Sequence, residues 1–278
     1  MSDSPSLLAS YVKAVAGAAP LPGRPKELTG DHLRTAEGIE LDREHVARYD
    51  RVCGFRLRDT LPPTYLHVVA FPSALSIMTD RSFPFGVLGL VHVENVIEHL
   101  RGVRIEETVD LRVEAANLRD HDSGRAIDLV AEARCDGELV WRGTSTYLRI
   151  GGGDGAKRSG ERPAPPRHQA IWSVPGDIGR RYADVSGDRN PIHLHPLTAK
   201  AFGMPGAIAH GMWVKARSLA ALEGALPEAF RVAARFKAPL VLPAKVAFAT
   251  WRAGDGRAFA VHDSKSGKPH LIGDVAPV

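Results

Sequence analysis

Alternation of apolar and polar residues marks two groups of strand-like segments, one in each half of the chain. Residues 108–119 (TVDLRVEAANLR) and 244–253 (AKVAFATWRA) show the period of two that is typical of antiparallel strands with one buried face. Tripeptides ending in glycine at 122–124 (DSG) and 265–267 (KSG) separate neighbouring segments and predict hairpin turns. The predicted strands are 87–98, 108–119, 126–136, 138–150, 230–241, 244–253, 258–264 and 270–278.

A helical run precedes each group of strands. Residues 70–79 (AFPSALSIMT) form the first run, and residues 209–224 form the second. In the second run, apolar residues at 212, 216, 219, 220 and 222 fit one buried stripe of a helix. One long helix followed by an antiparallel sheet, twice over, predicts an α+β fold.

The two halves also look like diverged copies of one unit. Tyr49 precedes Gly54 by five residues, and Tyr182 precedes Gly187 by the same interval. Between the halves, residues 151–169 (GGGDGAKRSGERPAPPRHQ) are rich in Gly, Pro and charge and contain almost no large apolar residue. We therefore expect one domain at 1–150, a linker at 151–169 and a second domain at 170–278.

Composition narrows the class of protein. The chain has 278 residues, of which 44% are hydrophobic and 24% charged, so wholesale disorder is not expected. Its two cysteines, Cys53 and Cys135, allow no framework of disulfides and favour a reduced, cytoplasmic setting. We expect no membrane span and no signal peptide. The net charge of +4 permits an anionic partner, but Lys and Arg are scattered, so nucleic acid is not expected.

The segment 182–193 (YADVSGDRNPIH) carries the candidate chemistry. Asp188 lies five residues before His193, with Asn190 between them, and the AHGM of 209–212 places Gly211 where the second helical run begins. Two proton-transfer groups and a backbone N–H could act together beside a carbonyl. From the residues alone, a turn-capping Asp188, a packed His193 and a Gly211 chosen for close packing remain open alternatives.

The segment 182–212 (YADVSGDRNPIHLHPLTAKAFGMPGAIAHGM) resembles the signature of the hydratase-2, or MaoC-like, family. The small Ala199 follows His193 by six residues, as in that family. The whole chain from about residue 5 resembles the two-domain version, a double hotdog with a degenerate first half. Residues 61–79 and 83–99 are further similar to actinobacterial (3R)-hydroxyacyl-thioester dehydratases.

The resemblance implies a reaction and a set of roles. The family interconverts (3R)-3-hydroxyacyl and trans-2-enoyl thioesters of coenzyme A or acyl carrier protein, without metal or redox cofactor. Asp188 and His193 would be the catalytic dyad, and Asn190 would hold the water or orient the carboxylate. The N–H of Gly211 would polarise the thioester carbonyl, while His210 would contact substrate or make a structural hydrogen bond at the helix start.

Aligning Gly54 with Gly187 places Phe55 opposite Asp188 and Thr60 opposite His193, so the first copy lacks the dyad. We therefore expect one active site per chain, with the first half shaping the acyl pocket. The two halves would form a pseudo-dimer, which leaves both a monomer and a homodimer open. The candidates for lining the pocket are Phe71, Met78, Phe83, Phe85 and Val87.

Two other functions, and a metal site, are alternatives to this interpretation. A hotdog acyl-thioesterase usually carries a carboxylate on its central helix, but here no Asp or Glu follows Gly211 until Glu223. A non-catalytic acyl-thioester binding protein would not need to retain the dyad. A metal site built from Asp188, His193 and His195 would lack a further strong ligand, so no metal is expected.

Overall fold

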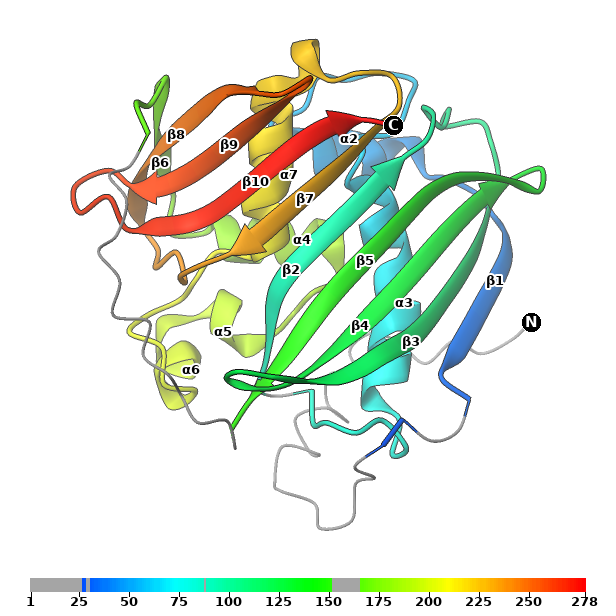
Figure 1. The fold of residues 1–278 in the computed structure, drawn as a ribbon, viewed down its shortest axis with the longest axis horizontal. Helices are drawn as coiled ribbons and strands as arrows, with labels where there is room; N and C mark the ends of the chain where they lie inside the picture. Colours follow the sequence, from blue (N-terminus) through cyan, green and yellow to red (C-terminus); the bar gives the residue numbers. More distant parts are fainter. Residues whose placement is uncertain (1–26, 29–30, 88, 152–165) are drawn as a thin grey trace.

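A ten-stranded antiparallel sheet runs through the molecule, and each half of the chain contributes five strands (Figure 1). The computed structural model describes residues 27–28, 31–87, 89–151 and 166–278. The strand order is β1-β3-β4-β5-β2-β7-β10-β9-β8-β6. The strands are β1 (Leu33–Ile39), β2 (Leu90–His99), β3 (Val109–His121), β4 (Gly124–Cys135), β5 (Glu138–Ile150), β6 (Ala170–Val174), β7 (Phe230–Phe236), β8 (Ala244–Ala253), β9 (Gly256–Asp263) and β10 (Pro269–Pro277).

All eight predicted strands and both predicted hairpin turns are confirmed, although β2 begins three residues later and β7 ends five residues earlier than expected. The two strands that the sequence did not predict, β1 and β6, occupy the two edges of the sheet. Each has a single strand neighbour and is at most seven residues long. Such edge strands carry a weak alternating pattern because little of their surface is buried.

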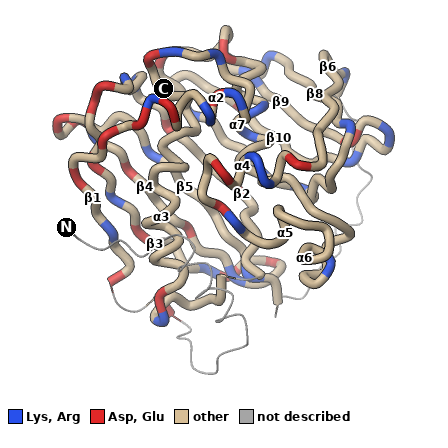
Figure 2. The backbone as a smooth tube through the Cα atoms, turned by 180° about the vertical axis from the view of Figure 1, so that it is seen from behind, with Lys and Arg blue, Asp and Glu red and all other residues tan. Residues whose placement is uncertain are grey.

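The helices lie on one face of the sheet, behind it in Figure 1 and in front of it in Figure 2. The prediction for the first long helix was wrong at its start, since α3 begins five residues before residue 70. Within the second predicted run, α7 is followed by a short 3-10 turn, Glu223–Ala225. The α-helices are α2 (Arg43–Cys53), α3 (Tyr65–Thr79), α4 (Ile178–Ser186), α5 (Pro191–Leu194), α6 (Pro196–Ala201) and α7 (Gly211–Leu222).

Helices α2 and α4 reveal the internal repeat most directly. Tyr49 and Tyr182 are both buried, and their ring centroids are 6.2 Å apart. Gly54 ends α2 with φ of 82°, and Gly187 ends α4 with φ of 74°. Glycine enters this left-handed region without a steric penalty, which explains why it recurs at the equivalent position of each copy.

The β2–β7 pair joins the two halves into one sheet, with Asn95 opposite Ala234. Lys215 of α7 is fully buried at this seam. Its Nζ donates to the Asn95 carbonyl at 3.0 Å, to Asn95 Oδ1 at 2.5 Å and to the Val232 carbonyl at 3.3 Å. One ammonium group therefore connects β2, β7 and α7.

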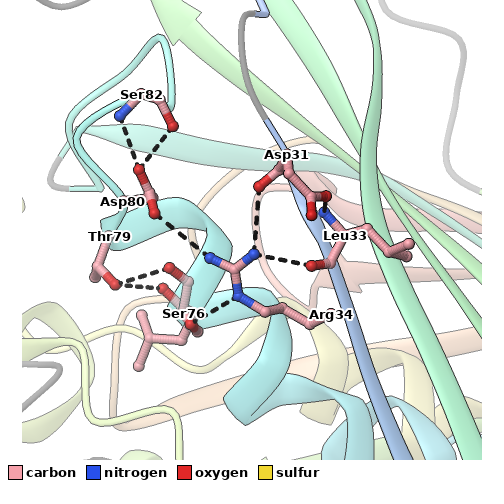
Figure 3. Close-up of polar contacts among 8 residues, drawn as sticks. Asp31, Leu33, Arg34, Ser76, Thr79, Asp80 and Ser82 are labelled. Atoms are coloured by element: carbon pink, nitrogen blue, oxygen red, sulfur yellow. Dashed lines mark hydrogen bonds and ion pairs between the residues drawn. The ribbon is translucent and has the colours of Figure 1, made fainter.

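At the edge of the sheet formed by β1, Arg34 joins this strand to the end of α3 (Figure 3). Its guanidinium donates to Ser76 Oγ at 3.3 Å and pairs with Asp80 at 3.4 Å. Asp80 in turn accepts hydrogen bonds from Ser82. These contacts fix a strand that is hydrogen-bonded to the sheet on one side.

Two expectations from composition can be compared with the structure. Cys53 and Cys135 are both buried and unpaired with each other, so the structure contains no disulfide between them. Within the described part of the chain, no helix is long and apolar enough to cross a membrane. The expected linker lies mostly outside the described residues.

Candidate active site

Two short helices bring the predicted dyad to one wall of a cavity. The left-handed Gly187 ends α4, and Asp188 follows it directly. Asn190 then caps α5, whose first residue is Pro191 and which carries His193. Proline at the first helical position has a suitable φ and needs no hydrogen bond for its nitrogen. The chain thus reverses between Asp188 and His193, and both line the same cavity.

His193 is held as a neutral imidazole. Its Nδ1 lies 2.8 Å from the carbonyl oxygen of Ile208. Because a carbonyl can only accept, Nδ1 carries the hydrogen, and Nε2 keeps its lone pair in the neutral ring. Burial lowers the pKa of His193, although the charge of Asp188 and the Ile208 carbonyl act in the opposite direction. The ring can therefore accept a proton at Nε2.

The loop carrying Asp188 is fixed on both sides. Asp188 Oδ1 accepts the backbone N–H of Asn190 at 3.2 Å. The Asp188 backbone N–H donates to Ser186 Oγ, and its carbonyl accepts from His210 Nε2 at 2.9 Å. The carboxylate itself keeps about 30% of its surface accessible. The backbone contacts hold this loop in place, and Asp188 lines the cavity.

His210 contacts both members of the dyad. Its side chain is buried, and its ring stacks on that of His193 with centroids 3.6 Å apart. Burial, reinforced by His193, lowers the pKa of His210 to about 3, so this ring is also neutral near pH 7. Its hydrogen bond to the Asp188 backbone matches the structural alternative considered from the sequence.

Asn190 combines the two roles considered for it. Its Oδ1 accepts the N–H of Ile192 at 3.3 Å and so caps α5, as expected of Asn before Pro. The residue also lines the cavity beside the dyad. The orientation of Asp188 comes from the Asn190 backbone, whereas its side chain holds the turn.

Gly211 is the first residue of α7 and also lines the cavity. Its N–H finds no acceptor among the described residues, as is usual in the first turn of a helix. A Cβ at this position would lie 2.8 Å from the ring of Phe236. Glycine is therefore required both for close packing and to leave a helix N-terminus open to a ligand.

The cavity has a volume of about 300 Å³ and is bounded by both halves of the chain. Among the candidates for its first-half wall, Phe71 lines it, whereas Val87 does not, and Met78, Phe83 and Phe85 are buried elsewhere in the core. Apolarity alone does not distinguish a pocket wall from a core. Three polar residues of the first half that line the cavity were not predicted from the sequence, His67, His92 and Tyr147.

The residues that cluster with Asp188 and His193 differ from the set considered from the sequence as a metal site. The exposed His195 caps α6 by accepting the N–H of Leu197, so it is not part of the cluster. His210 instead lies with Asp188 and His193, their candidate ligand atoms within 4.8 Å of one another. The two imidazole rings are stacked, with their planes 27° apart.

Comparisons with known proteins agree with this picture. Residues 161–271 match the model of the MaoC like domain family. The 3-hydroxyacyl-thioester dehydratase X of Mycobacterium tuberculosis is 35% identical over 278 residues, which cover 98% of each chain. A crystal structure of HtdX from the same organism has a TM-score of 0.79, with 35% identity, over 88% of this chain and 99% of that one.

A more distantly similar solved structure identifies the type of fold. A Mycobacterium tuberculosis protein described as having a double hotdog fold has a TM-score of 0.60 and 12% identity, over 88% of this chain and 96% of that one. At this identity the likeness concerns the fold alone. Together with the higher-identity match, it confirms the predicted α+β double hotdog.

Proposed function

Because the chain belongs to the MaoC-like 3-hydroxyacyl-thioester dehydratases, we propose that it interconverts (3R)-3-hydroxyacyl and trans-2-enoyl thioesters at Asp188 and His193. The observation that carries this proposal is the geometry of the cavity wall. A neutral His193 with a lone pair on Nε2, the Asp188 carboxylate and the N–H of Gly211 all border one cavity. These are the groups that removal of water next to a thioester needs.

In the dehydration direction, one member of the dyad takes the Cα proton. The electrons of that C–H bond form the Cα–Cβ double bond, and the Cβ–oxygen bond breaks. The dyad passes the same proton to the departing hydroxyl, which leaves as water. When the reaction runs as a hydration, the dyad takes a proton from water and passes it to Cα, and each proton transfer contributes roughly 10²–10⁴-fold.

Charge builds up on the thioester oxygen while the Cα proton is removed. We assign its stabilisation to the N–H of Gly211, assisted by the positive end of α7. Such a donor contributes about 3–4 kcal/mol in well-characterised oxyanion holes. His210 and Asn190 are positioning residues in this scheme, because they fix the backbone around Asp188.

The substrate is an acyl thioester carried by coenzyme A or an acyl carrier protein. The chemistry requires water and two proton-transfer groups, so the scheme assigns no metal or redox cofactor to the reaction. We also propose that residues 1–150 shape the acyl pocket, while residues 170–278 carry the dyad. In support, Phe55 and Thr60, the counterparts of the dyad, do not line the cavity.

The test is hydration of trans-2-enoyl-CoA substrates of four to sixteen carbons by wild type, Asp188→Asn and His193→Ala. We expect activity in the wild type and a loss of at least about 10³-fold in kcat for each variant, with unchanged circular dichroism. Phe55→Leu and Thr60→Ala are matched controls that should retain turnover. Near-wild-type activity in either dyad variant would refute the mechanism.

An inactive wild type would be followed by the same assay with acyl carrier protein substrates. If those are also not turned over but bind saturably, the protein is a non-catalytic acyl-thioester binder. If it releases free thiol from a saturated acyl thioester, it is a thioesterase. Free thiol and hydration can be measured in the same reaction, so the three outcomes are distinct.

A further inference from the structure

Three polar side chains belong to the part of the cavity wall that the first half supplies. His67 comes from α3, His92 from β2 and Tyr147 from β5. His92 and Tyr147 are opposite each other in the β2–β5 register, and their rings stack with centroids 4.6 Å apart. The His67 ring lies nearly parallel to that of His92, with centroids 6.2 Å apart. We call these three residues the polar wall.

A β-bulge contributes to this arrangement. The register between β2 and β5 shifts between His92 and Glu94, directly after the His92–Tyr147 pair. Such a bulge changes the direction in which side chains leave a strand, and bulges are common beside binding sites. His92 consequently lines the cavity, against Phe236 and Tyr147.

One polar atom of this wall, His92 Nε2, is buried without a hydrogen-bond partner among the described residues. His67 and Tyr147 are half-buried and line the cavity beside it. By contrast, the buried Tyr49 hydroxyl donates to Thr64 at 2.8 Å, and His193 reaches the Ile208 carbonyl. Since buried polar groups are normally hydrogen-bonded, this exception, next to two further polar side chains that line the same cavity, points to a polar group of a ligand.

The wall is uncharged near pH 7. Burial lowers the pKa of His67 to about 4 and that of His92 to about 3, and the charge of Lys215 acts in the same direction. Burial also raises the pKa of Tyr147. Each neutral imidazole and the phenol then offer both a donor and an acceptor. A hydroxyl group, itself both donor and acceptor, matches these partners, whereas a carboxylate or an ammonium ion would lack a counter-charge.

The polar wall borders the same cavity as Asp188 and His193. On the other side, His67 and Tyr147 also border a small void of about 20 Å³ within the first half. That void is lined mainly by small and apolar side chains, among them Ala70, Ala74, Ala131 and Gly143.

We infer that the acyl group of the substrate carries a hydroxyl beyond the reacting carbons, and that His67, His92 and Tyr147 bind this hydroxyl. The inference rests on the proposed function, because it concerns the acyl part of the same substrate. An unsubstituted chain would leave the polar wall without partners or trap water beside it. Sites built to bind a hydroxyl discriminate strongly against analogues that lack it.

The test compares trans-2-decenoyl-CoA with analogues that carry one hydroxyl, at each carbon from 5 to 10, all assayed by hydration. For the analogue that fits, the wild type should show a kcat/KM at least about 10-fold above that of the unsubstituted chain. One neutral hydrogen bond contributes roughly 3- to 10-fold, and more than one group of the polar wall would bind the hydroxyl. The ratio of the two kcat/KM values is the readout.

The variants His92→Phe and Tyr147→Phe keep the stacked rings and remove the polar atoms. Each should lower the ratio by about 3- to 10-fold, and the double variant should bring it close to one. Tyr65→Phe is the matched control, because its hydroxyl contacts His45 Nδ1 at 2.6 Å and does not line the cavity. It should leave the ratio unchanged.

The outcomes separate this inference from the proposed function. If the wild type hydrates the plain chain but prefers no hydroxylated analogue by fivefold or more, the inference is overturned and the function stands. A preference that survives in the double variant also overturns it. If the wild type hydrates none of the substrates on either carrier, the proposed function fails, and the inference fails with it.

Discussion

His193 and His210 show how two identical side chains in contact acquire different tasks. His193 donates from Nδ1 to the Ile208 carbonyl, which leaves Nε2 free to accept a proton. His210 donates from Nε2 to the Asp188 carbonyl, and its Nδ1 is buried without a partner. Burial keeps both rings neutral. The hydrogen-bond partner of each ring, rather than its identity, therefore decides whether it can act on a substrate.

His210→Phe tests the positioning role. The variant retains a ring to stack under His193 but loses the hydrogen bond that holds the Asp188 backbone. Because small displacements of a catalytic group are costly, we expect kcat to fall by about 10- to 100-fold. KM should stay within about threefold, since the ring donates to the protein backbone. Steady-state hydration kinetics provide both values.

A rise in KM at constant kcat would instead show that His210 contacts the substrate, which is the other role considered from the sequence. His262→Phe is a matched control, because His262 is also a buried histidine but does not line the cavity. It should change stability without changing the kinetics. A similar loss of kcat in both variants would contradict the positioning role.

At the scale of elements, α7 connects the site to the seam of the sheet. Gly211 opens the helix at the cavity, and Lys215 lies about one turn further along, where its ammonium joins β2 to β7. Since all three Lys215 donors have acceptors, its burial leaves no hydrogen unused. The position of the helix N-terminus thus depends on the contact between the two halves.

Lys215→Met should destabilise the protein by about 2–4 kcal/mol, because it leaves buried acceptors of Asn95 and Val232 without their donor. Urea unfolding measures this difference. Ser218→Ala is the matched control, as Ser218 is buried on the same helix and donates only to the Val214 carbonyl. It should cost about 1 kcal/mol. Equal losses would show that Lys215 does not stabilise the seam.

The elements that the sequence predicted are those with a strong local signal. Strands β3 and β8 alternate clearly, and the hairpin turns predicted at 122–124 and 265–267 follow the ends of β3 and β9. The start of α3 was missed because this helix is apolar on nearly all sides, so no stripe distinguishes its first turn. The edge strands β1 and β6 were missed because their pairing depends on the completed sheet.

For the whole molecule, the layout is that of an internal repeat. The strand order of the first half is repeated in reverse after the β2–β7 seam, so the two halves face each other across one cavity. The motif around Asp188 could be found from sequence because its residues are close along the chain. The polar wall could not, because residues 67, 92 and 147 meet only when three elements assemble.

The many buried histidines make the stability of the molecule dependent on pH. The pKa values of His67, His92, His99 and His210 lie at about 4, 3, 4 and 3, below the ordinary 6.5 of an unfolded chain. Between these values the unfolded chain binds more protons than the folded one. The contribution of these histidines to the free energy of unfolding is therefore fully present above about pH 6.5. It decreases as the pH falls, by up to about 1.4 kcal/mol per pH unit for each histidine.

Asp50 acts in the opposite direction, because burial raises its pKa to about 7, but it is one group against several histidines. We therefore expect a net loss of several kcal/mol between pH 7 and pH 5, a window above the ordinary pKa of carboxylates. Urea unfolding at pH 7, 6 and 5 measures it. His99→Phe, which removes one histidine packed on Phe230 away from the cavity, should reduce the slope, whereas His168→Gln at an exposed position should not. A stability that stays constant across this window would mean that the histidines take up protons without unfolding the protein.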